Sequence, residues 1–421
     1  MNLANVLAKR SPFYYGWVIL ATSGSTQVVR NAAASLTLAV FMYPMADDLG
    51  WSRTVLAGAA SAGGLASTFF SPVTGWAVDK YGARAVLSAS VLLLGITTFL
   101  TGWATVPLFF YITYGIGRVI FSSPVQIGSS VVVSRWFVKN RGRANGILSF
   151  CHSIGMTGFP LMASILIGIY GWQVTWQILG VDVWIVALLP AFLFLAETPE
   201  SVGVLPDGET PTNDIDSASN KNVVEEISWT LKEAMKTPAL WQLAIGTGLL
   251  YGIHSGTNTH MAAYLQDIGL DSKIAASSVS LTAVFTGLGG LSWGWLIEKL
   301  PARFCYALVA ALMGIAALLF ISVNSPLDAF AVASLFGVSL GGMLVIPPVA
   351  FANYFGRDSL GAIRGITEPF GAFGQAIGAL LSGIIRDGTE SYELAFYTMA
   401  VVAVLAIAMT VSAFMPKKNL Y

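Results

Sequence analysis

Two short stretches of this sequence share one pattern, and they decide how the chain folds. The first is Gly75-Trp76-Ala77-Val78-Asp79-Lys80-Tyr81-Gly82-Ala83-Arg84, and a weaker copy, Gly294-Trp295-Leu296-Ile297-Glu298-Lys299-Leu300-Pro301-Ala302-Arg303, begins 219 positions later. In each copy an apolar segment ends, an acid, a lysine and an arginine follow at fixed spacing, and another apolar segment begins at once. This pattern predicts a short cytoplasmic loop between two membrane helices, with a glycine for close packing and an acid that can face a base or a helix N-terminus. Its recurrence predicts that the chain is built from two repeats.

The composition is that of a membrane protein. Hydrophobic residues make up 55% of the 421 positions and charged residues 10%, against roughly 25% charged in soluble domains. At about 20 residues per spanning helix, we predict an all-α polytopic membrane protein with twelve transmembrane helices. The expected spans are 14–42, 53–77, 83–104, 107–134, 144–169, 173–195, 239–265, 275–297, 303–323, 328–353, 365–385 and 393–415.

The distribution of charge predicts the orientation of these helices. The formal net charge is zero, so the total suggests no nucleic-acid partner. Fourteen basic residues fall in the segments on one side and three in the loops on the other, which predicts that both termini are cytoplasmic. The inner set is Lys9, Arg10, Lys80, Arg84, Arg135, Lys139, Arg141, Arg143, Lys299, Arg303, Arg357, Arg364, Lys417 and Lys418, and the outer set is Arg53, Lys273 and Arg386. The two cysteines, Cys151 and Cys305, fall in or beside apolar spans and predict neither a disulfide framework nor a metal site.

One long polar stretch divides the chain into two halves. Residues 1–195 are expected to form an N-terminal six-helix bundle, 196–238 a cytoplasmic linker, and 239–421 a C-terminal six-helix bundle. Within the linker, apolar residues from Val224 to Met235 recur at helical spacing, which predicts an amphipathic helix along the membrane surface.

The doubled loop resembles the conserved loop of the major facilitator superfamily, which implies transport by alternating access. Over nearly its whole length the chain also resembles monocarboxylate transporters and the oxalate/formate exchanger group. The residues that carry this resemblance are Gly16-Trp17, Gly115-x-Gly117 with Pro124, Arg143-Ala144-Asn145-Gly146, Gly171-Trp172 and His260-x-x-x-Tyr264-Leu265-x-Asp267-x-Gly269.

The chain departs from those relatives where they bind the carboxylate. The resemblance implies an arginine in helix 8 one turn after an aspartate, but Gly287 and Ala283 occupy the matching positions, and Ser35 replaces the lysine frequent in helix 1. The helix 11 lysine of the exchangers has no match. Either other cations hold the anion, or the substrate is not a simple monocarboxylate.

Two arginines are the leading candidates for that role. Arg30 in helix 1 and Arg118 in helix 4 each lie 15 or 16 residues from the inner end, which at about 1.5 Å per residue places both about 22 to 24 Å up. A charge at that depth costs at least ~2.5 kcal/mol, and the family resemblance implies that helices 1, 4, 7 and 10 line the central path. The alternative is that the arginines pair with an internal acid such as Asp182, or with backbone carbonyls.

Polar residues on the same helices complete the predicted substrate site. In helix 7, His254 is expected at the level of the arginines with Asn258 one turn above, while His260 is favoured by resemblance but lies nearer the outer mouth. An imidazole there could carry a proton; His152 in helix 5 is assigned to helix packing. Ser122 and Gln126 lie on the Arg118 side of helix 4, where they either contact substrate or hydrogen-bond between helices.

The remaining charged residues near the inner end are predicted to gate the transporter. Asp79, Arg84, Glu298 and Arg303 are expected as latches between the halves, the first copy being the stronger because Pro301 replaces its glycine. Arg364 and Glu368, one helical turn apart, are expected to form a structural or gating ion pair.

The sequence therefore predicts a secondary transporter of the plasma membrane that moves a small organic anion, a monocarboxylate, by proton symport or by exchange with a counter-anion. Its partners would be this anion, protons or the counter-anion, and the lipid bilayer, with no nucleic acid. An efflux transporter for neutral or hydrophobic solutes is the alternative, and a non-transporting receptor or scaffold is a third class. No nucleotide-binding loop, nucleophile–base pair or metal-ligand cluster is evident, so neither an enzyme nor a cofactor is expected.

Overall fold

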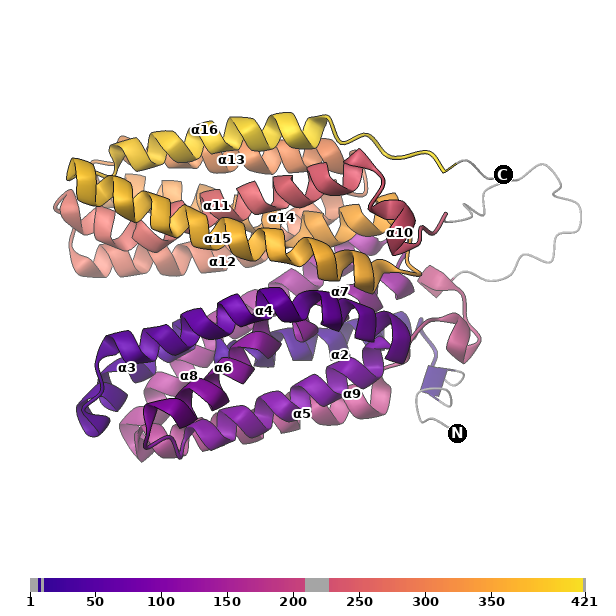
Figure 1. Ribbon diagram of the computed structural model, residues 1–421, viewed down its shortest axis with the longest axis horizontal. Helices are drawn as coiled ribbons and strands as arrows, with labels where there is room; N and C mark the ends of the chain where they lie inside the picture. Colours follow the sequence, from indigo (N-terminus) through magenta and orange to yellow (C-terminus); the bar gives the residue numbers. More distant parts are fainter. Residues whose placement is uncertain (1–6, 9–10, 209–226, 419–421) are drawn as a thin grey trace, which may run out of the picture.

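The chain folds into a bundle of long helices that run between two ends of the molecule (Figure 1). This computed structural model describes residues 7–8, 11–208 and 227–418, and these residues contain no β-strand. The first and the last described residues lie at the same end of the bundle. We call this end, which carries the basic loops, the inner end, and the opposite one the outer end.

The described residues contain all twelve expected crossings, so the predicted fold class is confirmed. The first four crossings are α2–η1–α3 (Gly16–Val29, Arg30–Ala33 and Ser35–Leu49), α4 (Arg53–Tyr81), α5 (Ala83–Thr101) and α6–α7 (Pro107–Ser122 and Pro124–Trp136). The long helix α8 (Arg141–Val183) contains the fifth crossing and the start of the sixth, which continues through η2 (Trp184–Leu188) and α9 (Leu189–Phe194). In the second half the crossings are α11 (Pro238–Asp267), α12 (Ser272–Leu296), α13 (Ala302–Ile321), α14 (Pro326–Phe355), α15 (Leu360–Thr389) and α16 (Glu393–Val411). The fifth and sixth crossings meet at Gly171, whose φ of 77° favours glycine.

Some crossings are less apolar than a membrane helix usually is. Among the described residues, eight continuous helical segments are long and apolar enough to span a membrane by composition alone. α8 with its continuation counts once in this number, and α4, α11 and α15 are not included. These three helices pack on one another, α4 against α15 and α15 against α11. Small and polar residues suit such helix–helix surfaces, because they let the backbones approach closely.

Glycines bring the two halves into backbone contact at the inner end. A Cβ atom on Gly75 would lie 2.1 Å from the carbonyl oxygen of Gly361, and one on Gly294 would lie 2.6 Å from that of Gly142. The two contacts are equivalent under the repeat. Gly75 of the first contact corresponds to Gly294 of the second, 219 positions later, and Gly142 of the second corresponds to Gly361 of the first by the same shift. The repeat seen in the sequence is therefore also a repeat of the contact between the halves.

The linker differs from the sequence-based expectation. The part of the predicted amphipathic helix that lies in 209–226 is outside the described residues, but residues 227–230 are not helical, and the only helix in the described remainder is the four-residue α10 (Leu231–Ala234). Two contacts account for this: Trp229 donates its backbone N–H to the carbonyl of Phe355 at 2.9 Å, and Thr230 begins α10 with a capping box to Glu233. Two short turns, η3 (Glu200–Val202) and η4 (Pro206–Gly208), lie earlier in the linker.

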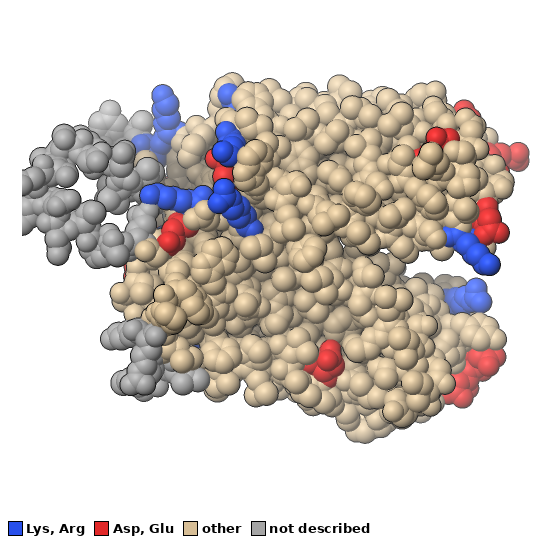
Figure 2. Space-filling view, turned by 180° about the vertical axis from the view of Figure 1, so that it is seen from behind, with Lys and Arg blue, Asp and Glu red and all other residues tan. Residues whose placement is uncertain are grey.

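The surface is apolar between two charged ends. Large hydrophobic side chains such as Phe69, Leu108, Leu327 and Leu380 are well exposed, as expected for residues that face lipid. Figure 2 shows Lys, Arg, Asp and Glu gathered mostly toward the two ends, and a notch between the halves at the outer end. Because the glycine contacts lie at the inner end, this conformation is closed inside and parted outside.

Candidate functional site

The first crossing is interrupted at Arg30. α2 ends at Val29, η1 follows, and Ala34 has an extended backbone (φ −71°, ψ 150°) before α3 begins. A break at this depth leaves carbonyl groups that need other donors. Arg30 is 3% exposed, and its Nη1 donates to the carbonyl of Phe121 at 3.0 Å and to Oε1 of Gln126 at 2.9 Å.

The fourth crossing is interrupted at the same depth. α6 ends at Ser122, Ser123 has φ −127° and ψ −80°, and Pro124, which has no N–H, begins α7. Arg118 of α6 donates from Nη1 to the carbonyl of Ala33 at 3.4 Å, and the Tyr114 hydroxyl donates to the same carbonyl at 3.2 Å. Each arginine thus bonds to a carbonyl next to the break in the other's helix.

Both guanidinium groups lie over one aromatic ring. The Cζ atoms of Arg30 and Arg118 are 4.6 Å and 4.8 Å from the centroid of Phe121, within the range of cation–π contacts. Neither arginine forms an ion pair with an acidic side chain among the described residues, so the predicted alternative of a pair with Asp182 is not present, whereas bonds to backbone carbonyls are. Arg118 Nε is buried without a hydrogen-bond partner in the described part of the chain.

His152 supports Arg30 from α8. Its Nδ1 lies 3.4 Å from Nε and 3.3 Å from Nη2 of Arg30, and 3.2 Å from Nδ2 of Asn31. Because these neighbours are donors, Nδ1 serves as the acceptor and its proton belongs on Nε2. The sequence assigned His152 to packing, and the structure gives it a direct contact with a candidate site residue instead.

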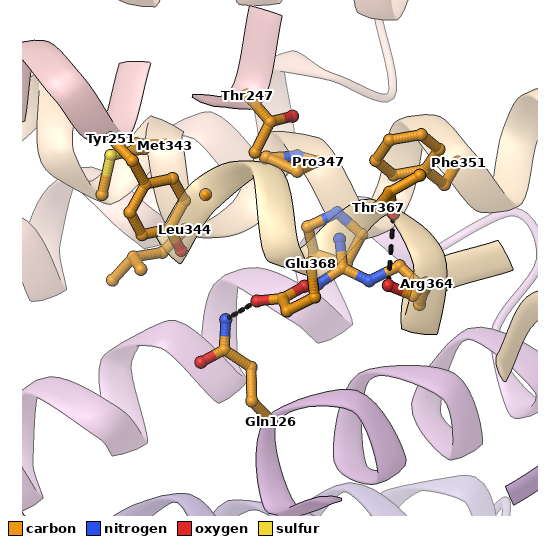
Figure 3. A pocket seen from close by; sticks show the side chains of 12 residues that line it. Gln126, Thr247, Tyr251, Met343, Leu344, Pro347, Phe351, Arg364, Thr367 and Glu368 are labelled. Carbon is orange, nitrogen blue, oxygen red and sulfur yellow. Dashed lines mark hydrogen bonds and ion pairs between the residues drawn. The ribbon is translucent and has the colours of Figure 1, made fainter. Parts of the chain in front are cut away.

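A series of hydrogen bonds leads from Arg30 into the second half. Gln126 of α7 accepts from Arg30 and donates from Nε2 to Oε1 of Glu368 on α15 at 2.5 Å. Glu368 accepts in turn, at Oε2, from Nη2 of Arg364 at 2.7 Å. Figure 3 shows the Gln126 side chain reaching Glu368 from the opposite half. Glu368 is thus bound directly by Arg364 and is linked to Arg30 through Gln126.

A small cavity lies beside this bridge (Figure 3). Its polar lining comes from Gln126 and from Thr247, Tyr251, Arg364, Thr367 and Glu368 of the second half, and apolar residues of α14 such as Phe351 complete it. Sequence reasoning missed Thr247 and Tyr251, although both lie on the face of α11 that continues inward from the predicted His254 at helical spacing.

The structure does not bring the remaining predicted substrate residues into contact with the arginines. The His254 ring lies against Phe336, with centroids 6.4 Å apart, and its buried Nδ1 lacks a partner among the described residues. His260 lies within the second half, 3.0 Å from the carbonyl of Ala379 and against Tyr392. Asn258 and Ser122 are partly buried, and no described residue hydrogen-bonds to either side chain. The structure describes no group of three potential metal-ligating residues.

Two of the predicted latch residues bridge the halves at the inner end. Asp79 of α4 lies 2.8 Å from Arg135 and accepts backbone N–H groups at the start of α15. Glu298 accepts the backbone N–H of Arg143 at 2.9 Å and lies 3.0 Å from its Nε. Arg135 also pairs with Glu197.

The other two latch residues lie within their own halves in this conformation. Arg84 donates to the carbonyl of Phe192 at 2.6 Å. Arg303 lies over the ring of Phe414, 4.3 Å from its centroid. Arg84 and Arg303 lie at the start of α5 and α13, the helices that follow the repeated loop. Their side chains contact neighbouring helices of the same half and do not cross the interface.

Twelve crossings in two repeats, closed at one end around a polar centre, define a polytopic membrane transporter fold. The chain belongs to the Major Facilitator Superfamily, whose family model matches residues 27–367. It is 23% identical to monocarboxylate transporter 9 of Gallus gallus, over 91% of this chain and 89% of that protein. It is 26% identical to the hexose-6-phosphate:phosphate antiporter of Salmonella typhimurium, over 73% and 68%. The crystal structure of the human organic anion transporter MFSD10 shares the fold, with a TM-score of 0.70 at 15% identity over 94% of this chain and 99% of that one.

Proposed function

We propose that this protein is a secondary transporter of the plasma membrane that moves a small organic anion, a carboxylate, by alternating access. Proton symport or exchange with a counter-anion would supply the driving force. The observation that carries the proposal is the placement of Arg30 and Arg118 over Phe121, deep between the ends of the bundle and without an acidic partner among the described residues.

The electrostatics of this centre favour an anionic ligand. Charged groups inside a membrane protein are costly, so they are retained where they serve a substrate, an ion or a partner. Arg30 and Arg364 share the single carboxylate of Glu368 in this network, and Arg118 pairs with no acid among the described residues, so a bound carboxylate would neutralise an excess of positive charge. A planar guanidinium can bind a carboxylate through two parallel hydrogen bonds, and Arg118 Nε has no competing partner among the described residues.

We further propose that residues 1–195 and 239–421 are the two units that rock against each other, with 196–238 as their tether. The backbone contacts at Gly75 and Gly294 and the bonds of Asp79 and Glu298 would close the inner end while the anion enters from outside. The names of the relatives, which refer to monocarboxylates, hexose phosphate and organic anions, support an anionic substrate.

Uptake of radiolabelled carboxylates into proteoliposomes tests this proposal. Arg30→Gln and Arg118→Gln should each abolish saturable uptake, while Arg53→Gln, an exposed residue at the start of α4, serves as the matched control and should retain it. Uptake that persists unchanged in both centre variants would overturn the site, and the absence of carboxylate flux in the wild type would overturn the substrate class.

A second candidate is efflux of neutral or hydrophobic solutes. The observation that favours it is the apolar share of the cavity lining, which includes Met343, Leu344 and Phe351, together with the absence of ionisable residues from Ser278 to Trp295 in α12. In that case transport would be insensitive to Arg30→Gln and Arg118→Gln, so the same variants separate the two functions.

A further inference from the structure

Glu368 lies where a bound anion would be expected. Its side chain and that of Arg364 are 14% and 5% exposed. One carboxylate oxygen accepts the Gln126 amide from the first half at 2.5 Å, and the other accepts the Arg364 guanidinium at 2.7 Å. The carboxylate is therefore held by one donor from each half of the protein.

An ordinary ion pair within a helix does not account for this arrangement. Pairs four residues apart on exposed helices contribute little and need no third partner. Here the pair is buried at the contact between the halves, Gln126 is itself bound by Arg30, and Arg364 Nε is buried without a partner among the described residues. Arg364 thus keeps a buried donor that Glu368 does not satisfy in the described part of the chain.

The cavity beside Glu368 has room for about one water-sized acceptor atom. Thr247, Tyr251 and Thr367 line it together with Arg364 and Gln126 (Figure 3). A carboxylate that enters this cavity meets the same two donors that Glu368 now uses. Two carboxylates at one site repel each other, so the incoming group and Glu368 compete.

We propose that Glu368 is a resident carboxylate that occupies the anion site and is displaced from Gln126 and Arg364 by the carboxylate of the substrate. This inference rests on the proposed function and adds a residue that sets affinity. Displacement also breaks the Gln126–Glu368 bond, which ties α7 of the first half to α15 of the second. Substrate binding and loosening of the halves are then one event. A neutral ligand, which cannot replace a carboxylate at Arg364, does not trigger it.

Binding measurements on the detergent-purified full chain test the proposal. The probes are acetate, lactate, pyruvate and benzoate, each compared with its neutral amide, and the readouts are isothermal calorimetry and thermal shift. Glu368→Gln keeps the size and the polarity of the side chain but removes the competing charge. We expect it to bind the carboxylates more tightly by about tenfold and to leave the affinity for the amides unchanged.

A further variant tests the sign of the charge effect. Gln126→Glu adds a negative charge between Arg30 and Glu368, and it should weaken carboxylate binding by about tenfold, which gives a result of opposite sign if Glu368→Gln does not fold.

The outcomes distinguish this inference from the function on which it rests. Carboxylate binding to the wild type that is unchanged or weaker in Glu368→Gln would overturn the role of Glu368 alone and leave an anion transporter with a structural ion pair. Equal tightening for carboxylates and amides would also overturn it. If no carboxylate binds the wild type or Glu368→Gln, the proposed function falls, and this inference with it.

Discussion

The carboxylate of Asp79 lies at the N-terminus of a helix in the other half, where Oδ2 accepts the backbone N–H of Ala362 at 2.6 Å and Oδ1 that of Gly361 at 2.9 Å. A carboxylate at this position satisfies unpaired helix donors and the helix dipole together. Glu298 has the equivalent relationship with the N-terminus of α8, through Arg143. The two acids of the repeated loop therefore close the inner end in the same way, once from each half.

Asp79→Asn should weaken this closure without affecting the substrate site. Asparagine keeps one acceptor oxygen but loses the charge that faces the helix N-terminus and Arg135. We expect the maximal transport rate to fall by about tenfold, equivalent to about 1.4 kcal/mol, while the affinity measured by calorimetry changes little. An affinity change as large as the rate change would make the loop a part of the binding site.

Glu298→Gln should have a smaller effect of the same kind. Asp79 takes two backbone donors and the guanidinium of Arg135, whereas Glu298 takes one backbone donor and the guanidinium of Arg143, which is half exposed. Exposed ion pairs contribute little, so we expect the transport rate of Glu298→Gln to lie between those of Asp79→Asn and the wild type. A rate below that of Asp79→Asn would reverse the predicted order of the two latches.

A methyl group at either contact glycine should prevent the inner end from closing. The Cβ of Gly75→Ala or Gly294→Ala would lie 2.1 Å or 2.6 Å from a backbone oxygen, which cannot move aside as a side chain can. Ser149, which faces Gly290 across the interface, is a suitable reporter as Ser149→Cys in a chain with Cys151 and Cys305 replaced. We expect a membrane-impermeant maleimide to label it several-fold faster in the alanine variants when applied from the inner side.

Gly158→Ala is the matched control for that experiment. A Cβ at Gly158 meets no other atom within 4 Å, so the same chemical change occurs on a helix with space for it, and labelling of Ser149→Cys should stay slow. Equal acceleration in Gly158→Ala would show that the label reports general loosening instead of the glycine contacts.

The Thr230–Glu233 capping box should make the stability of the linker region depend on pH. The pKa of Glu233 is lowered from 4.5 to about 2, first by the bond from the Thr230 backbone N–H and then by Lys418. Because the folded pKa lies below the unfolded one, the contribution is present above pH 4.5 and is lost as pH falls toward 2. The melting temperature of the wild type should therefore exceed that of Glu233→Gln at pH 7, and the difference should shrink below pH 4.5.

Lys418→Gln provides the comparison for this pH series. It removes the weaker cause of the pKa shift and keeps the Thr230 bond, so most of the effect of Glu233→Gln should persist in that background. A difference that stays constant from pH 7 to pH 3 would mean that the carboxylate charge plays no part.

The sequence was sufficient for the architecture and for part of the centre. The repeated loop and the apolar spans predicted twelve crossings because length, hydropathy and basic residues act along the chain itself. Counting residues from the inner end predicted one depth for Arg30 and Arg118, and both lie over Phe121. That step succeeded because the rise of a helix is constant.

Features that depend on helix rotation or on contacts between the halves were not predictable. The approach of Gln126 to Glu368 spans 242 positions, and nothing in either helix indicates it. Over residues 227–230 the predicted amphipathic helix is not formed, because Trp229 bonds to Phe355 instead of continuing a helix. A tertiary hydrogen bond can therefore outweigh periodicity.

Phe121→Leu should weaken anion binding because it removes the ring that supports Arg30 and Arg118. Leucine retains apolar bulk but lacks the ring face that attracts both guanidinium groups. Each buried cation–π contact contributes on the order of 1 kcal/mol, and without it Arg30 and Arg118 keep their carbonyl bonds but lose their common support. We expect carboxylate affinity to fall by roughly fivefold to tenfold, measured by calorimetry with benzoate.

Phe121→Tyr separates the role of the ring from that of its volume. The ring face remains, so benzoate affinity should stay within about twofold of the wild type. A loss in Phe121→Tyr equal to that in Phe121→Leu would mean that tight packing around the ring, and not its attraction for the two arginines, maintains the site. An unchanged affinity in Phe121→Leu would mean that the carbonyls of Phe121 and Ala33 suffice to hold Arg30 and Arg118 in place.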